Sequence, residues 1–153
     1  MEHQNTWNTL REFNETHREI ERFYNRCAAQ AGVPTSAYYI LYDMHELGDG
    51  CLQVDLCRTS LLSKQTVHSA VRKLEQEGFL RLQPKGRGVQ LFLTDAGKRM
   101  MEEKILPVIR AEQAALRAMG SEQTEELLRL YRLFFANLQR EMAGTTQKSE
   151  DNV

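Results

Sequence analysis

Long apolar runs and paired cysteines are both missing from this sequence of 153 residues. No apolar run approaches the roughly 18–20 residues that a membrane span requires, and the opening MEHQNTWNTLREFNE lacks the basic start and apolar core of a signal peptide. The three cysteines, Cys27, Cys51 and Cys57, form no CxxC pair and no even disulfide set. We therefore expect a reduced, cytoplasmic protein that does not enter the membrane.

Motifs of the common enzyme classes are absent as well. The sequence contains no P-loop, no Rossmann glycine run, no GxSxG and no HExxH. Its four histidines are scattered, and none lies at metal-ligand spacing from another histidine or a cysteine. A zinc or iron site assembled in three dimensions from His17, His45 and nearby carboxylates stays an alternative. We expect no enzyme activity, no cofactor and no metal.

Composition and charge indicate a globular protein with one strongly basic segment. Charged residues make up 27% of the chain and hydrophobic residues 41%, and the length fits one domain with a sizeable core. The formal net charge is only −1. Residues 58–99, however, hold nine basic and three acidic side chains, against eleven and eighteen in the remainder. This charge asymmetry indicates that the basic segment binds a polyanion. Chance clustering of the basic residues is the alternative.

The segment LSKQTVHSAVRKLEQEG, residues 62–78, reads as a helix with both ends marked. Ser63 can cap its N-terminus, Leu62 and Val67 can form a hydrophobic staple, and Gly78 can end it. Four apolar residues follow the i, i+3, i+4, i+7 spacing of a buried helix face: Val67, Ala70, Val71 and Leu74.

The other side of this helix combines positive charge with hydrogen-bonding groups. Such side chains contact phosphates and base edges in the DNA major groove; an ordinary solvated helix face is the alternative. They are Lys64, Gln65, His68, Ser69, Arg72 and Lys73.

A basic hairpin is predicted directly after this helix. Residues 79–83 and 89–93 read as strands, and the intervening turn carries Lys85 and Arg87 at a cationic tip. A short helix over 54–60 precedes the basic helix, so the two form a helix-turn-helix. Together with the hairpin, this predicts a winged helix, with the tip over the minor groove or the backbone.

Helices are predicted on both sides of this region. The spacing predicts helices over 6–30 and 35–47, a third from Thr94 to about 119 with a kink or break at Pro107, and a fourth from residue 121. The apolar stripes of the first and last helices are too long to face water alone, so we expect them to pack against a second subunit.

The order of these elements resembles the MarR (multiple antibiotic resistance regulator) family of bacterial transcription factors. The most specific stretches are LSKQTVHSAVRKLEQEGFL and the LTDAGK of residues 93–98. The resemblance implies a mainly α fold with a small β-hairpin wing, in a dimer whose N- and C-terminal helices interlock. It divides a single domain, 1–153, into a winged helix-turn-helix at about 35–95, dimerisation helices at about 5–31 and 96–142, and a polar tail at 143–153.

The resemblance also implies a function. Members of the family generally repress promoters and release DNA when a small ligand or an oxidant acts near the junction of the dimerisation and winged-helix regions. The wing departs from the usual pattern, because Arg87 lacks the acidic partner that the family places before it. Leu61 and Cys57 stand where small residues are usual.

The sequence therefore predicts a homodimeric, sequence-specific DNA-binding regulator, a ligand-responsive repressor on a pseudo-palindromic operator. The alternative is a winged-helix module that binds an acidic protein. A dimer would place two recognition helices ~34 Å apart in successive major grooves. Base readout is assigned to Gln65, His68, Ser69 and Arg72, phosphate contact to Lys64, Lys73, Lys85 and Arg87, and further contacts to Ser63 and Thr66.

Aromatic residues and cysteines supply the candidates for regulation. Cys27 and Cys57 fall on apolar stripes, as core residues do, so Cys51 is the most exposed candidate for a redox-sensing thiol. A further set of ring-bearing side chains consists of Phe13, His17, Tyr38, Tyr39 and Tyr42. These residues could line an effector pocket, and ordinary core and dimer packing explains them equally well.

Overall fold

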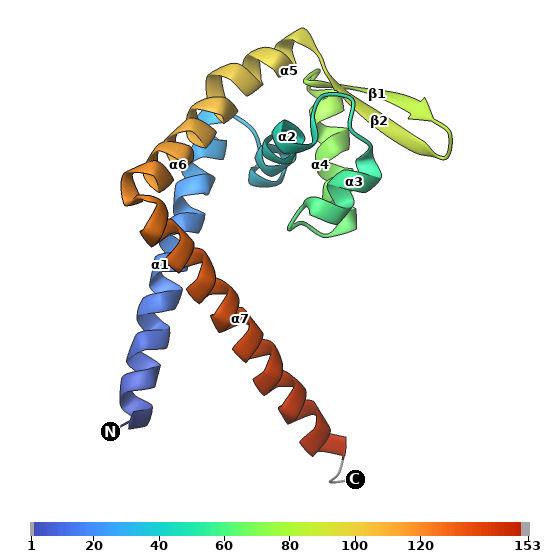
Figure 1. Cartoon of the computed structure of the whole chain (residues 1–153). Coiled ribbons are helices and arrows are strands. Elements are labelled where there is room, and N and C mark those ends of the chain that lie inside the picture. Colours follow the sequence, from blue (N-terminus) through green and yellow to red (C-terminus); the bar gives the residue numbers. More distant parts are fainter. Residues whose placement is uncertain (1, 151–153) are drawn as a thin grey trace. The chain divides into compact units, whose positions relative to one another are not determined.

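The computed structural model describes residues 2–150, with side chains for residues 5–143. Internal contacts divide the chain into two compact units, one ending at Ile109 and the other beginning at Arg110. The first unit contains the winged helix-turn-helix and α1, and α7 lies in the second (Figure 1). Among the residues described, no helix is long and apolar enough to cross a membrane.

Two helices open the chain, as predicted. α1 spans Glu2–Ala31, and α2 spans Thr35–Leu47. Gly32, at φ 75°, turns the chain between them, and Pro34 precedes the first residue of α2. Ala37, Ile40, Leu41 and Met44 form the buried face of α2, and Tyr38 joins them in the core.

The helix-turn-helix consists of α3, Gln53–Thr59, and α4, Lys64–Gln76. The Ser63 side chain accepts a hydrogen bond from the Thr66 backbone N–H at 3.1 Å, which is the predicted N-cap. Gly78, at φ 79°, lies beyond the C-terminus, where the Phe79 N–H donates to the Leu74 carbonyl at 2.9 Å. Both predicted ends of the helix are therefore confirmed.

The wing is an antiparallel hairpin of β1, Leu80–Lys85, and β2, Gly88–Leu93. Lys85 pairs with Gly88, so only Gly86 and Arg87 form the tip, and the predicted turn over 84–88 was too long. Gly86, at φ 59°, takes the left-handed conformation that such a tight turn requires. Leu52, which precedes α3, adds an isolated antiparallel bridge to Gln90. In Figure 1 the hairpin projects beyond α3 and α4.

The helix after the wing is continuous but irregular. α5, Asp95–Met100, passes into the π-helical η1, Met101–Ile105, and then into α6, Leu106–Met119. Pro107 has no N–H with which to continue the α-helical ladder, and the wider π turn immediately before it accommodates the loss. The predicted irregularity therefore lies one turn before the proline. The Thr94 side chain caps α5 by accepting from the Gly97 N–H at 3.1 Å.

The last helix, α7, spans Ser121–Glu150 and follows Gly120 at φ 84°. It extends beyond the predicted boundary at residue 142, so most of the expected polar tail is helical; residues 151–153 lie outside the described part. Large apolar side chains along α1 and α7 are exposed in the single chain. They include Trp7, Leu10, Ile20 and Phe23 of α1, and Leu127, Leu128, Tyr131, Phe134, Phe135, Leu138 and Met142 of α7.

Gly97 is required where α5 packs on the start of the wing. A Cβ at this position would lie 2.1 Å from the Phe79 carbonyl oxygen, an impossible contact with backbone. We expect Gly97→Ala to lower the free energy of unfolding by about 3 kcal/mol, the upper part of the range for overpacking. Urea unfolding followed by circular dichroism measures this change.

Gly88→Ala is the matched control, because its Cβ would lie at ordinary contact distances of 3.7 and 3.8 Å from its nearest neighbours. Equal stability of the Gly97→Ala and Gly88→Ala proteins would contradict the packing described.

Candidate nucleic-acid interface

The outward face of α4 is the centre of the candidate interface. Val67, Val71 and Leu74 are fully buried, and α4 packs against α2. This packing turns the opposite side of the helix outward. The predicted contact residues Ser63, Lys64, Gln65, His68, Ser69, Arg72 and Lys73 are all exposed, as are Lys85 and Arg87 on the wing.

Two of the predicted contact residues are used in capping the helix. Besides accepting from the Thr66 N–H, Ser63 Oγ lies 2.8 Å from Thr66 Oγ1. Thr66 is half-buried. These side chains therefore stabilise the first turn of α4, while the turn's remaining N–H groups stay available to an anion.

The wing tip and α4 line one shared hollow. It has a volume of about 260 Å³. Lys64 and His68 reach it from α4, Arg87 from the tip, and Gln53 from α3. Gln53 Nε2 lies 2.8 Å from His68 Nδ1, so the two helices are joined by a hydrogen bond at this point. Sequence reasoning missed Gln53, since nothing in its spacing marks it as a partner of His68.

Most of the basic side chains here are only weakly held by carboxylates. Lys73 Nζ lies 3.1 Å from Glu77 Oε1, and Arg72 is 4.0 Å from Glu75 Oε2. The Arg72 side chain is 75% exposed. Exposed pairs of this kind contribute little energy, so a phosphate or base can replace the carboxylate at little cost.

Arg81 differs from the other basic residues, and the sequence did not single it out. Its guanidinium carbon lies 4.8 Å above the centre of the Phe92 ring on the paired strand. Its Nη1 also donates to Gln83 Oε1 at 3.1 Å. These contacts fix Arg81 on the hairpin surface and stiffen the wing.

A second hollow, of about 350 Å³, opens between α1, α2 and the turn before α4. Three of the five residues predicted for an effector pocket line it: His17, Tyr39 and Tyr42. The complete lining is His17, Ile20, Glu21, Tyr24, Tyr39, Tyr42, Asp43 and Leu61.

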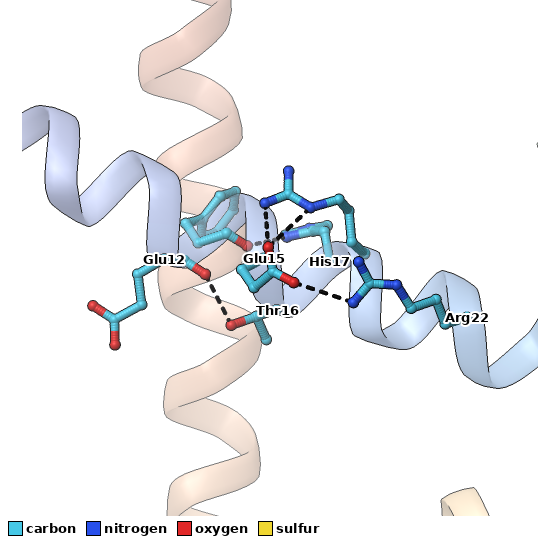
Figure 2. A network of polar contacts seen from close by, with 7 residues as sticks. Glu12, Glu15, Thr16, His17 and Arg22 are labelled. Atoms are coloured by element: carbon cyan, nitrogen blue, oxygen red, sulfur yellow. Dashed lines mark hydrogen bonds and ion pairs between the residues drawn. The ribbon is translucent and has the colours of Figure 1, made fainter.

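Phe13 and Tyr38 do not line this cavity. Tyr38 is completely buried in the core, and its hydroxyl lies 3.5 Å from the Lys104 carbonyl oxygen. Phe13 stacks against the His17 ring, with centroids 4.4 Å apart. In Figure 2 the His17 ring is bonded back to the α1 backbone, Nδ1 to Phe13 O at 3.0 Å, beside the ion pairs of Glu15 with two arginines.

Asp43 is the least satisfied polar residue of the cavity. Its Oδ2 is buried and has no hydrogen-bond partner in the described part of the chain. Burial raises the pKa of this carboxyl above its ordinary value, opposed by a hydrogen bond from the Ser60 side chain. Burial also raises the pKa of Tyr39, with Glu21 adding to the effect. Sequence reasoning missed Asp43, which falls beside the buried face of α2.

The cysteines do not have the features of a redox sensor at the predicted position. Burial raises the pKa of the Cys51 thiol to about 11, the opposite of the lowered value that a reactive thiol needs. Cys27 and Cys57 are half-buried and pack against the core. In the described part of the chain, no cluster of three or more histidine, cysteine or acidic side chains is placed to hold a metal ion.

Residues 31–88 match the sequence profile described as the MarR family. A MarR family transcriptional regulator from Streptomyces coelicolor, in complex with DNA, is 24% identical, with 86% of each chain covered and a TM-score of 0.68. S. aureus MepR, in complex with DNA, is 18% identical over 82% of this chain and 94% of that one, with a TM-score of 0.66.

A third solved structure was determined with a small molecule. It is an organohalide-sensing transcriptional regulator in its 2,4-dichlorophenol-bound form, 17% identical over 84% of this chain and 78% of that one, with a TM-score of 0.64. No curated protein matches the chain in sequence.

A helix-turn-helix followed by a two-stranded wing defines the class of winged-helix proteins. Within that class, residues 31–88 match the MarR family profile and the fold is similar to that of solved MarR family regulators, in agreement with the resemblance drawn from residues 62–80 and 93–98.

The raised pKa of Cys51 predicts a thiol that resists alkylation. A rise of about two pH units leaves roughly a hundredfold less thiolate than in a free cysteine at neutral pH. Peptide mass spectrometry after timed iodoacetamide treatment at pH 7.5 measures the rate at each cysteine. Alkylation of Cys51 as fast as that of a short cysteine peptide would show that the thiol is not shielded.

The raised pKa of Asp43 predicts a pH-dependent effect of Asp43→Asn. A carboxyl whose pKa rises on folding contributes stability below its unfolded pKa and loses it as pH rises through the folded value. The variant should therefore be more stable than the natural chain at pH 7.5, and this advantage should vanish near pH 4. We expect under about 1 kcal/mol, because solvent screens the half-exposed residue.

Urea unfolding at both pH values measures this difference. Glu12→Gln, which removes an exposed carboxylate on α1, serves as the control and should show no such gain. An advantage of Asp43→Asn that grows toward pH 4 would reverse the assigned direction.

Proposed function

We propose that this protein is a homodimeric, sequence-specific DNA-binding transcriptional regulator of the cytoplasm, and that a small ligand releases it from a pseudo-palindromic operator. The observation that carries the proposal is the exposed basic face of α4 beside the basic wing tip, with Lys64, His68 and Arg87 around one hollow. The DNA complexes of two proteins with this fold support the same use of the surface.

The assignment of contacts follows from position on α4 and the wing. Gln65, His68, Ser69 and Arg72 lie on the exposed face that a major groove would meet, and they read base edges. Lys64, Lys73, Lys85 and Arg87 hold phosphates, and the backbone N–H groups near Ser63 add an anion site at the helix N-terminus.

Dimer formation is supported by the exposed apolar faces of α1 and α7. Phe135 and Leu138 on α7 keep 56% and 46% of their surface exposed in the single chain, and Trp7 on α1 keeps 63%. Apolar surface of this extent along two 30-residue helices marks a protein interface. A two-fold dimer would present two copies of α4 to successive major grooves.

Ligand control is supported by the cavity beside α2, which combines aromatic walls with a few polar groups. The dichlorophenol-bound structure shows that one protein with this fold accepts a small molecule. A ligand that binds better to a dimer whose α4 spacing misfits DNA would release the operator.

The second candidate is a winged-helix module whose basic face binds an acidic protein. It rests on the same exposed charges, and both candidates predict binding that weakens with salt. Selection of bound duplexes from a random pool separates them. A regulator enriches one palindromic sequence over scrambled duplex of equal length, whereas enrichment of no sequence would exclude specific DNA recognition.

Arg72→Ala should reduce affinity for the selected duplex by about 1–3 kcal/mol and relax the sequence preference at one position, because a bidentate contact to guanine is lost. Lys85→Ala should instead weaken all duplexes equally and lower the salt slope by about 1. Fluorescence anisotropy against a panel of single-base variants measures both effects.

Arg129→Ala, on α7 and paired with Glu126 at 2.6 Å, is the control and should leave DNA affinity unchanged. A uniform loss for Arg72→Ala across the panel would reassign Arg72 to a phosphate.

A further inference from the structure

The cavity between α1, α2 and the turn before α4 has an uneven charge. Glu21 of α1 and Asp43 of α2 both line it, and its described lining contains no lysine or arginine. An anionic ligand would meet two carboxylates with no lysine or arginine to offset them. A cation would be attracted by both.

One carboxylate oxygen of Asp43 also lacks a hydrogen-bond donor. Hydrogen bonding from the Ser60 side chain lowers the pKa of this carboxyl, while Oδ2 is buried without a partner in the described structure. A buried acceptor left unpaired costs free energy that a donor would recover. A ligand ammonium group at the part of the Asp43 side chain that lines the cavity would bring a positive charge and hydrogen-bond donors to this carboxylate.

The walls of the cavity suit an aromatic ligand. Tyr24 lies with its ring centre 5.9 Å from that of Tyr39 and 6.5 Å from that of Tyr42. Aromatic faces attract cations, and aromatic edges and faces pack against other rings. The volume of about 350 Å³ limits the occupant to a small molecule.

We propose that this cavity binds a protonated arylalkylamine, with its ammonium group against the Asp43 carboxylate and its ring among Tyr24, Tyr39 and Tyr42. This assignment names the ligand class of the regulator proposed above and rests on that function. It distinguishes the site from one that selects phenols or carboxylic acids.

The cavity is joined to the recognition helix by a short path. The Ser60 hydroxyl that donates to Asp43 also accepts from the Leu62 N–H at 3.3 Å, one residue before the Ser63 cap. Leu61, fully exposed, lines the cavity from the same turn. An ammonium group that takes over Asp43 competes with Ser60, and the turn that sets the start of α4 shifts with it.

The test titrates the full-length protein, without DNA, with three probes of similar size in a calorimeter. They are 2-phenylethylamine, positively charged at pH 7.5, neutral 2-phenylethanol and anionic 3-phenylpropanoate. We expect the amine to bind about tenfold or more tightly than the alcohol, as one hydrogen bond between charged groups provides, and the anion to bind weakest. Absence of binding by the amine, or tighter binding by the alcohol or the anion, overturns the proposal.

Variants assign the effect to Asp43. Asp43→Asn keeps the shape of the side chain and should remove the preference for the amine over the alcohol. Glu46→Gln, one turn further along α2 and outside the cavity lining, removes an equal charge and should keep the preference. Glu21→Gln, at an exposed position that folding does not need, should lower amine affinity by a smaller factor. An unchanged preference in Asp43→Asn overturns the assignment.

DNA binding is measured separately, on the selected duplex. The amine should release the natural chain from DNA and leave the Asp43→Asn complex intact at the same concentration. A protein that selects a palindrome but ignores the amine would refute the ligand class while keeping the regulator. A protein that binds the amine but selects no DNA would refute the regulator alone.

Discussion

Burial of one face of α4 against α2 is the constraint on which the candidate DNA-binding surface depends. Val67, Val71 and Leu74 are completely removed from water, and each side chain of this size contributes about 1.5–3 kcal/mol. Rotating α4 about its axis would expose them, so the orientation of the helix is fixed. Side chains on the opposite side of the helix, such as Lys64 and Arg72, are therefore directed toward the solvent.

The wing is held in position relative to α4 by a small number of backbone contacts. Thr94 donates from Oγ1 to the Gly78 carbonyl at 2.6 Å and from its backbone N–H to the Phe79 carbonyl at 3.1 Å. These bonds join the end of α4, the beginning of β1 and the cap of α5 at one point. Because the base of the hairpin is fixed there, its tip arrives beside Lys64 and His68 and forms a continuous basic surface.

The turn between α3 and α4 lies between the two candidate sites. Its first residue, Ser60, bonds to Asp43 in the aromatic cavity, and its last, Ser63, caps the helix that faces outward. The fold therefore places the proposed ligand site and the candidate DNA-binding face within a few residues of each other.

The sequence by itself determined the local structure, that is, where helices begin and end and which face of a helix is apolar. The cap at Ser63, the helix boundaries near residues 31 and 120 and the apolar period of α4 depend on residues close together in the chain, and the structure has them where the pattern predicted. Partnerships across elements were decided only by the tertiary structure. Tyr38 and Tyr39 are neighbours in sequence, yet one is buried in the core and the other lines the cavity. Helix periodicity gives the direction of each side chain on its own helix. The packing of the helices decides which residue of another element it contacts, as it does for Gln53 with His68 and for Asp43 with Ser60.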